Sequence, residues 1–166
     1  MKAQDLIDLD VSNIEQEKRR VSGLLVLLAK ESGETKCRIA NELIEIVVNP
    51  HERIARRSQA AFLLGTSSKS LEIRGSSKVS EALVGTLDAE FLGAAQGSMD
   101  IGRNYRKEAI EVDGLRLVFL QGLVFSIVVI KPALRGAVAK RLYDLVNDAQ
   151  LREWLQKVTN IAPLSD

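Results

Sequence analysis

The fold class of this chain is decided by residues 109–130, which read AIEVDGLRLVFLQGLVFSIVVI. Asp113-Gly114 separates two apolar runs, and Asp-Gly in that place favours a tight β-hairpin because both turn positions require positive φ. Gln121-Gly122 offers a second turn, and residues 123–130 are rich in β-branched side chains, as a strand buried on both faces is. We therefore predict a small antiparallel β-meander near 109–130.

The rest of the chain has the apolar spacing of amphipathic helices. Asn49 is suited to cap a helix that begins at Pro50, and Gly65 is suited to end it. The same spacing predicts further helices at 13–30, 35–49, from 78 onward, at 89–101, from 132 onward and at 149–158. Together with the meander, these segments predict an α+β fold that is mostly helical and has C-terminal helices after its sheet.

The length fits one globular domain, because 166 residues and 18.3 kDa leave little room for a second core. We expect an N-terminal segment at 1–12, a single globular domain at 13–160 and a tail at 161–166. Cys37 falls among the apolar positions of the second helix and is expected to act as a small core residue. The periodic apolar faces predict these core residues: Leu24, Leu28, Leu43, Val47, Leu64, Val118, Phe125, Val128 and Leu142.

One stretch resembles a known repeat family. Arg57, Ala60, Ala61, Leu64 and Gly65 resemble the Arg-x-x-Ala-Ala-x-x-Leu-Gly core of a HEAT repeat, over the length of one repeat. Expected helix starts near 13, 51, 88 and 131 have spacings within the range of that family. The resemblance implies an alternative architecture, an all-α HEAT-like helical solenoid.

Composition and charge exclude several classes of protein. Hydrophobic residues make up 46% of the chain, and 23 Lys and Arg against 22 Asp and Glu give a net charge of +1, so no global field attracts nucleic acid or an acidic membrane. Cys37 is the only cysteine, which favours a cytoplasmic, intracellular protein without disulfides. The most apolar stretch, 117–130, is shorter than the about 20 residues of a helical membrane span, so we expect no membrane span.

Residues suited to catalysis or metal binding are few. His51 is the only histidine, and neither a His-Glu-x-x-His zinc motif nor a Gly-x-Ser-x-Gly nucleophile elbow occurs. With one histidine and one cysteine, a zinc site would need carboxylate ligands, which is unusual. We therefore predict no metal, no cofactor and no enzymatic activity, with His51 a solvated residue at a helix start.

Basic residues cluster at several places, and two of these clusters are candidate binding surfaces. Arg53, Arg56 and Arg57 lie three and four residues apart, on one face of a predicted helix, and Arg103, Arg106 and Lys107 form the second cluster. Such clusters can meet phosphates if the fold brings them together. Aromatic residues are only 4% of the chain, so platforms for base stacking are scarce. Both clusters are therefore candidate surfaces for a protein partner or for nucleic acid.

Residues 66–77 form the clearest loop of the chain, since they are rich in serine and contain glycine. Its serines lie near Lys69, Arg74 and Lys78, whose charge would suit an added phosphate. They are the candidate phosphorylation sites Ser67, Ser68, Ser70, Ser76 and Ser77.

Two function hypotheses follow from these observations. The first is a non-enzymatic protein–protein interaction or assembly protein, an adaptor or scaffold that contacts a protein partner or a second copy of itself. The alternative is a nucleic-acid-binding or packaging protein that uses the basic helix face. We favour the first, because the compensating acids and the few aromatic residues argue against a dedicated nucleic-acid groove.

Overall fold

The computed structural model describes residues 1–7, 11–92, 112–145 and 148–159. Within these ranges the chain has no strand and forms eight α-helices: α1 (Ala3–Ile7), α2 (Ile14–Leu28), α3 (Gly33–Val48), α4 (Ile54–Thr66), α5 (Ser77–Leu87), α6 (Gly114–Ile130), α7 (Arg135–Leu145) and α8 (Ala149–Thr159). Two 3₁₀ turns, η1 (Val11–Asn13) and η4 (Pro132–Leu134), precede α2 and α7. A π-helical turn, η2 (Asp88–Leu92), continues α5.

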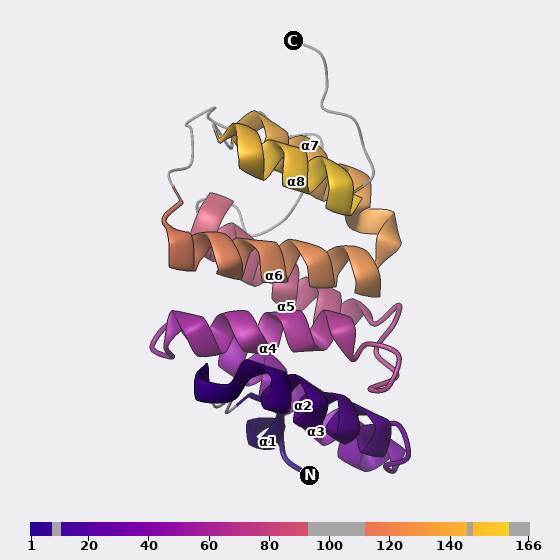
Figure 1. The fold of residues 1–166 in the computed structure, drawn as a ribbon. Coiled ribbons are helices and arrows are strands. Elements are labelled where there is room, and N and C mark those ends of the chain that lie inside the picture. The colour runs from indigo at the N-terminus through magenta and orange to yellow at the C-terminus, as the bar shows by residue number, and fades with distance from the viewer. Residues whose placement is uncertain (8–10, 93–111, 146–147, 160–166) are drawn as a thin grey trace.

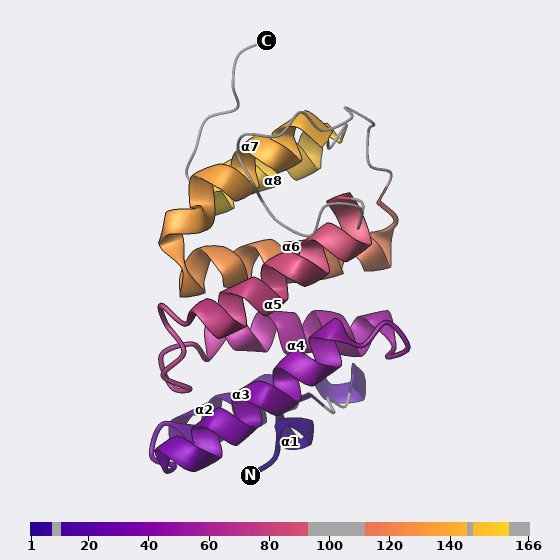
Figure 2. The ribbon, with the colours of Figure 1, turned by 180° about the vertical axis from the view of Figure 1, so that it is seen from behind.

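The helices stack in two layers. α2, α4, α6 and α8 form the layer that faces the viewer in Figure 1, and α3, α5 and α7 form the layer that faces the viewer in Figure 2. Successive helices from α2 onward thus alternate between the layers, and the stack rises from α1 and α2 at one end to α7 and α8 at the other. α6 packs most extensively against α4 and next against α5, so these three helices form the centre of the stack.

The predicted meander near 109–130 is wrong, because α6 spans Gly114–Ile130 without a break. Asp113 is not a hairpin residue: its side chain accepts a hydrogen bond from the backbone N–H of Arg116 at 2.8 Å and caps the helix. Gln121-Gly122 is likewise no turn, since both residues lie inside the helix. The expected strand residues 109–111 lie outside the described residues.

The helix replaces the strand because of what surrounds it. A short apolar run bounded by turn residues is consistent with a buried strand or a buried helix, and periodicity alone does not separate them. α6 is enclosed by α4, α5 and the α7–α8 pair, and a helix that is apolar around its circumference is stable in such a place. Burial on several sides thus accounts for the dense Val, Ile and Leu content of 123–130.

The starts of α2, α3 and α5 lie within two residues of the predicted starts at 13, 35 and 78, whereas the predicted starts at Pro50, 89 and 132 do not match an α-helix start. Asn13, Ser32 and Ser76 each accept a backbone N–H at the start of α2, α3 and α5. The third helix begins at Ile54 and not at Pro50, because Asn49 Oδ1 accepts the N–H of His51 at 3.0 Å in a turn that precedes the helix.

Most predicted core residues are buried. Leu28, Leu43, Val47, Leu64, Val128 and Leu142 lie in the core. Leu24 and Phe125 are only half-buried, and Val118 is exposed because it lies on the outer face of α6. Cys37 is exposed as well, so the expectation that it belongs to the core is wrong.

The helical content expected under the solenoid alternative agrees with the structure, but its repeat spacing does not. Residue 88, an expected helix start, lies at the end of α5, where the chain continues into η2. Ala60, Ala61 and Leu64 are fully buried, as their match to a repeat core implies. No helix among the described residues is long and apolar enough to cross a membrane.

Candidate functional site

An apolar groove lies on the α2–α4–α6 face, where Val21 of α2 and Leu115 and Val118 of α6 flank α4. Its volume is about 390 Å³. The lining residues carry no charge, and they are Leu6, Val21, Ala55, Ser58, Gln59, Phe62, Leu63, Thr66, Leu115 and Val118. We call this site the α4 groove.

The floor of the groove is one stripe of α4. Ala55, Gln59, Phe62 and Thr66 recur every three or four residues, which is the spacing of one helix face and spans about 16 Å at 1.5 Å per residue. On the wall formed by α6, Leu115 is 62% exposed and Val118 is 45% exposed. The groove therefore presents large apolar side chains to solvent.

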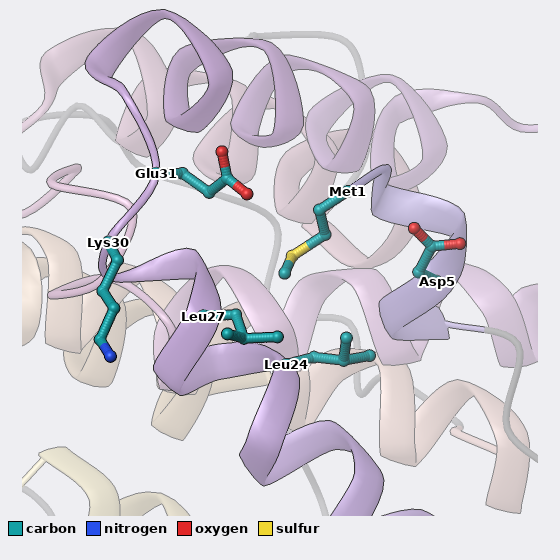
Figure 3. A pocket seen from close by; sticks show the side chains of 6 residues that line it. All are labelled: Met1, Asp5, Leu24, Leu27, Lys30 and Glu31. Atoms are coloured by element: carbon teal, nitrogen blue, oxygen red, sulfur yellow. The ribbon is translucent and has the colours of Figure 1, made fainter.

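A second hollow lies at the end of the stack, between α1 and α2. It is lined by Met1, Asp5, Leu24, Leu27, Lys30 and Glu31, and the carboxylates of Asp5 and Glu31 lie on either side of the Met1 side chain (Figure 3). Charged groups of both signs line it, so it offers less continuous apolar surface than the α4 groove.

Of the predicted arginine face, Arg57 is turned into the protein. It is 4% exposed, its Nη1 lies 2.8 Å from Glu90 Oε1, and its Nε donates to the carbonyl of Val47 at 2.9 Å. The guanidinium also lies over the ring of Phe119, 4.6 Å from the centroid. These contacts tie α4 to α3, η2 and α6.

The other predicted basic residues have different environments. Arg56 is half-buried, pairs with Glu52 at 3.2 Å and donates to Gln4 Oε1 of α1. Arg53 is exposed, and the structure shows no partner for its guanidinium among the described residues. The second cluster, Arg103, Arg106 and Lys107, lies outside the described residues.

The π-helical turn η2 carries a buried carboxylate, Asp88, that the sequence analysis did not identify. Asp88 Oδ1 accepts a hydrogen bond from Arg141 Nη1 of α7 at 3.0 Å, and both side chains are buried. Burial raises the pKa of Asp88, and the nearby Arg141 charge opposes this effect. Arg116 donates to the backbone carbonyl of Glu90 and lies over the ring of Phe91.

The candidate phosphorylation sites differ in accessibility. Ser67 and Ser68 are buried, and Ser67 donates to the carbonyl of Leu63. Ser70 and Ser76 are partly buried, and Ser76 caps α5. Ser77 is exposed in the first turn of α5, where Lys131 Nζ donates to its hydroxyl at 3.3 Å.

The residues considered for catalysis do not come together. His51 lies exposed in the turn before α4, and Cys37 lies exposed on α3. No cluster of three or more His, Cys, Asp or Glu residues suited to a metal ion occurs in the described part of the chain.

Comparison with known proteins adds no assignment. The chain matches no protein-family model, and searches of curated proteins and of solved structures return no match.

The sequence pattern does not predict the α4 groove, because residues 114–130, which form one side of it as α6, are expected from that pattern to form strands. If 114–130 is written as a helix, Leu115 and Val118 fall three residues apart and share one face. The Asp88–Arg141 pair left no comparable signal, since its members lie 53 residues apart.

Proposed function

We propose that this chain is a non-enzymatic protein-interaction or assembly protein that binds a helix of a protein partner in the α4 groove. The observation that carries the proposal is the uncharged lining of the groove together with the exposure of Leu115 and Val118. Binding a partner would remove this apolar surface from water, which is favourable.

An amphipathic helix fits the shape of the site. The α4 stripe from Ala55 to Thr66 is about three turns long, and a helix with apolar side chains at i, i+3 or i+4, i+7 and i+11 has a matching length and period. An uncharged lining disfavours a buried charge on the partner, so the contacting face of that helix should be apolar.

Nucleic-acid binding has less support from the arrangement of the arginines. The guanidinium of Arg57 is already engaged in contacts with Glu90, the Val47 carbonyl and the Phe119 ring. Of the three, only Arg53 is exposed, and one cation neutralises too few phosphates for strong binding.

The proposal is tested by selection of displayed peptides. The full chain serves as bait for a phage library of helix-forming peptides of about 16 residues, with Val118→Glu as the counter-selection bait because a charge there should block apolar binding. We expect selected peptides to carry the i, i+3 or i+4, i+7 apolar pattern and to bind Val118→Glu at least about tenfold more weakly, which corresponds to about 1.4 kcal/mol.

Val26→Glu is the matched control, because Val26 is 60% exposed on α2 and does not line the groove. It should bind the selected peptides as the wild-type chain does. Peptides that bind wild type and Val118→Glu equally, or no enrichment at all, would overturn the proposal. Self-association in sedimentation that Val118→Glu abolishes would assign the groove to a second copy instead.

A further inference from the structure

The η2 turn joins the centre of the stack to its last helix pair through two acids. Glu90 pairs with Arg57 of α4, and Asp88 pairs with Arg141 of α7. Because the two acids are two residues apart in a π-helical turn, one short segment reaches partners on either side of it. π-helical turns are uncommon and occur frequently at functional sites.

The two pairs are not equally satisfied. The Arg57 guanidinium has a carboxylate, a backbone carbonyl and an aromatic ring as neighbours, and Glu90 keeps partial access to solvent. Asp88, by contrast, is 1% exposed, and its second oxygen, Oδ2, has no hydrogen-bond partner among the described residues. Removing this oxygen from water costs free energy, and no hydrogen bond to Oδ2 offsets that cost.

What Arg141 holds in place is the α7–α8 pair. Val138, Leu142, Leu151 and Leu155 of these helices are buried, whereas α7 and α8 each touch α6 far less extensively than α4 does. Figures 1 and 2 show the pair lying across the end of the stack beyond α6. The α7–α8 pair is therefore attached to the centre of the stack far less extensively than α4 or α5, and weakly attached units open locally at low free energy.

Separation of the α7–α8 pair from α6 would expose an apolar surface of α6. α6 has a single charged residue, Arg116, and its buried side chains cover most of its circumference apart from the face that carries Val118. Apolar side chains on the side toward α7 and α8 would meet water if the pair moved away. Detachment thus creates a second apolar face next to the α4 groove, on the same helix that forms one wall of that groove.

We infer that the buried Asp88–Arg141 pair is a latch that fixes the α7–α8 pair on α6, and that its loss releases α7 and α8 together while α3 to α6 stay folded. The pair sets where α7 docks and adds little net stability, since buried ion pairs are often matched by apolar residues of similar volume. Removing Arg141 has a large effect, because Asp88 is left as a buried carboxylate without its cation.

The test is hydrogen exchange of the full chain, read separately over α7–α8 and over α3–α4. Arg141→Met should raise amide exchange in α7 and α8 by about tenfold or more and leave α3 and α4 protected. The double variant Asp88→Leu, Arg141→Met removes both charges and should restore protection of α7 and α8 to near the wild-type level.

Arg56→Met is the control, since Arg56 belongs to a partly exposed pair with Glu52 far from α7. It should leave exchange in α7 and α8 unchanged. Unchanged exchange in Arg141→Met would overturn the latch, and so would a rise in exchange over all helices or a failure of that variant to fold, because either result makes the pair part of the common core. A double variant as unprotected as Arg141→Met would overturn it as well.

Discussion

Gly65 of α4 and Ser126 of α6 lie closer together than a side chain at position 65 would permit. A Cβ on Gly65 would be 2.5 Å from Ser126 Oγ and 2.7 Å from Phe125 Cε1. The Ser126 hydroxyl donates to the carbonyl of Ala61, one turn earlier on α4, so the approach is fixed by a buried hydrogen bond. Gly122 of α6 has the reciprocal role against Phe62.

This contact predicts opposite effects for two glycine substitutions. Gly65→Ala should lower the free energy of unfolding by about 1–3 kcal/mol, because the added methyl group forces α4 and α6 apart. Gly85→Ala should raise it by about 0.5–1 kcal/mol, since position 85 is inside α5 and has nothing within 4 Å of its Cβ. Urea denaturation followed by circular dichroism measures both, and equal effects of the two would contradict the close contact.

The arginine cluster supplies a second matched pair. Arg57→Ala should cost about 3 kcal/mol of stability, because it leaves the Val47 carbonyl and Glu90 without their partner. Arg53→Ala removes an exposed side chain and should change stability by less than about 0.5 kcal/mol. Denaturant midpoints measure the difference, and an Arg57→Ala variant as stable as Arg53→Ala would contradict the structural role of Arg57.

How far the sequence predicts this fold depends on the kind of signal. Asn13, Ser32 and Ser76 act through their own backbone neighbours, so the starts of α2, α3 and α5 can be located from local sequence. Asp113 also caps a helix, but the dipeptide Asp-Gly is equally typical of a hairpin turn. The choice between the two depends on α4 and α5, which enclose α6 and are distant in sequence.

The environments of the candidate site residues are likewise not predictable from local sequence alone. Arg53, Arg56 and Arg57 are equivalent by helical spacing, yet only the structure shows that Arg57 is buried against Phe119. Serine-rich composition correctly located a loop between α4 and α5 but did not separate the buried Ser67 and Ser68 from the exposed Ser77. Burial arises from long-range packing, which local composition does not record.

Phosphorylation of the loop is predicted to be tolerated at one serine and disruptive at another. Ser77→Glu places a negative charge in the first turn of α5 beside Lys131 and should change stability by less than about 1 kcal/mol, with a stabilising sign. Ser68→Glu buries a charge where the Ser68 hydroxyl accepts from Arg74 Nε at 3.3 Å, and it should destabilise the fold by about 2–4 kcal/mol. Thermal melting compares them, and the reverse order would contradict the placement of both serines.

Glu42 of α3 gives a prediction in the acid range. Hydrogen bonding from the N–H of Ala3 at 2.9 Å lowers the pKa of Glu42, and the Arg38 guanidinium at 2.7 Å lowers it further. A lowered carboxyl pKa contributes stability that is present at neutral pH and is lost as pH falls through the folded-state pKa. Glu42→Gln should therefore reduce the melting temperature at pH 7 and reduce its dependence on pH in the acid range.

Glu45→Gln is the control for this prediction, because Glu45 is exposed on the same helix and the structure shows no partner for its side chain within the described ranges. It should leave the pH dependence unchanged. A Glu42→Gln variant with the wild-type acid profile would show that the link between α1 and α3 does not depend on the charge of Glu42.

Asp88 is predicted to change the pH dependence of stability in the opposite direction from Glu42. Burial raises its pKa, although Arg141 opposes the shift, so the folded chain holds a proton on Asp88 at pH values where the unfolded chain has released it. The free energy of unfolding should then fall as pH rises through the window above about 4, the usual pKa of an aspartate. Asp88→Asn should remove this part of the decline, whereas Arg141→Met, which removes the opposing charge, should steepen it and move it to higher pH. Urea titrations at a series of pH values measure the slopes, with the exposed Glu81→Gln as the variant that should match wild type. A wild-type slope retained in Asp88→Asn would mean that another group carries the pH dependence.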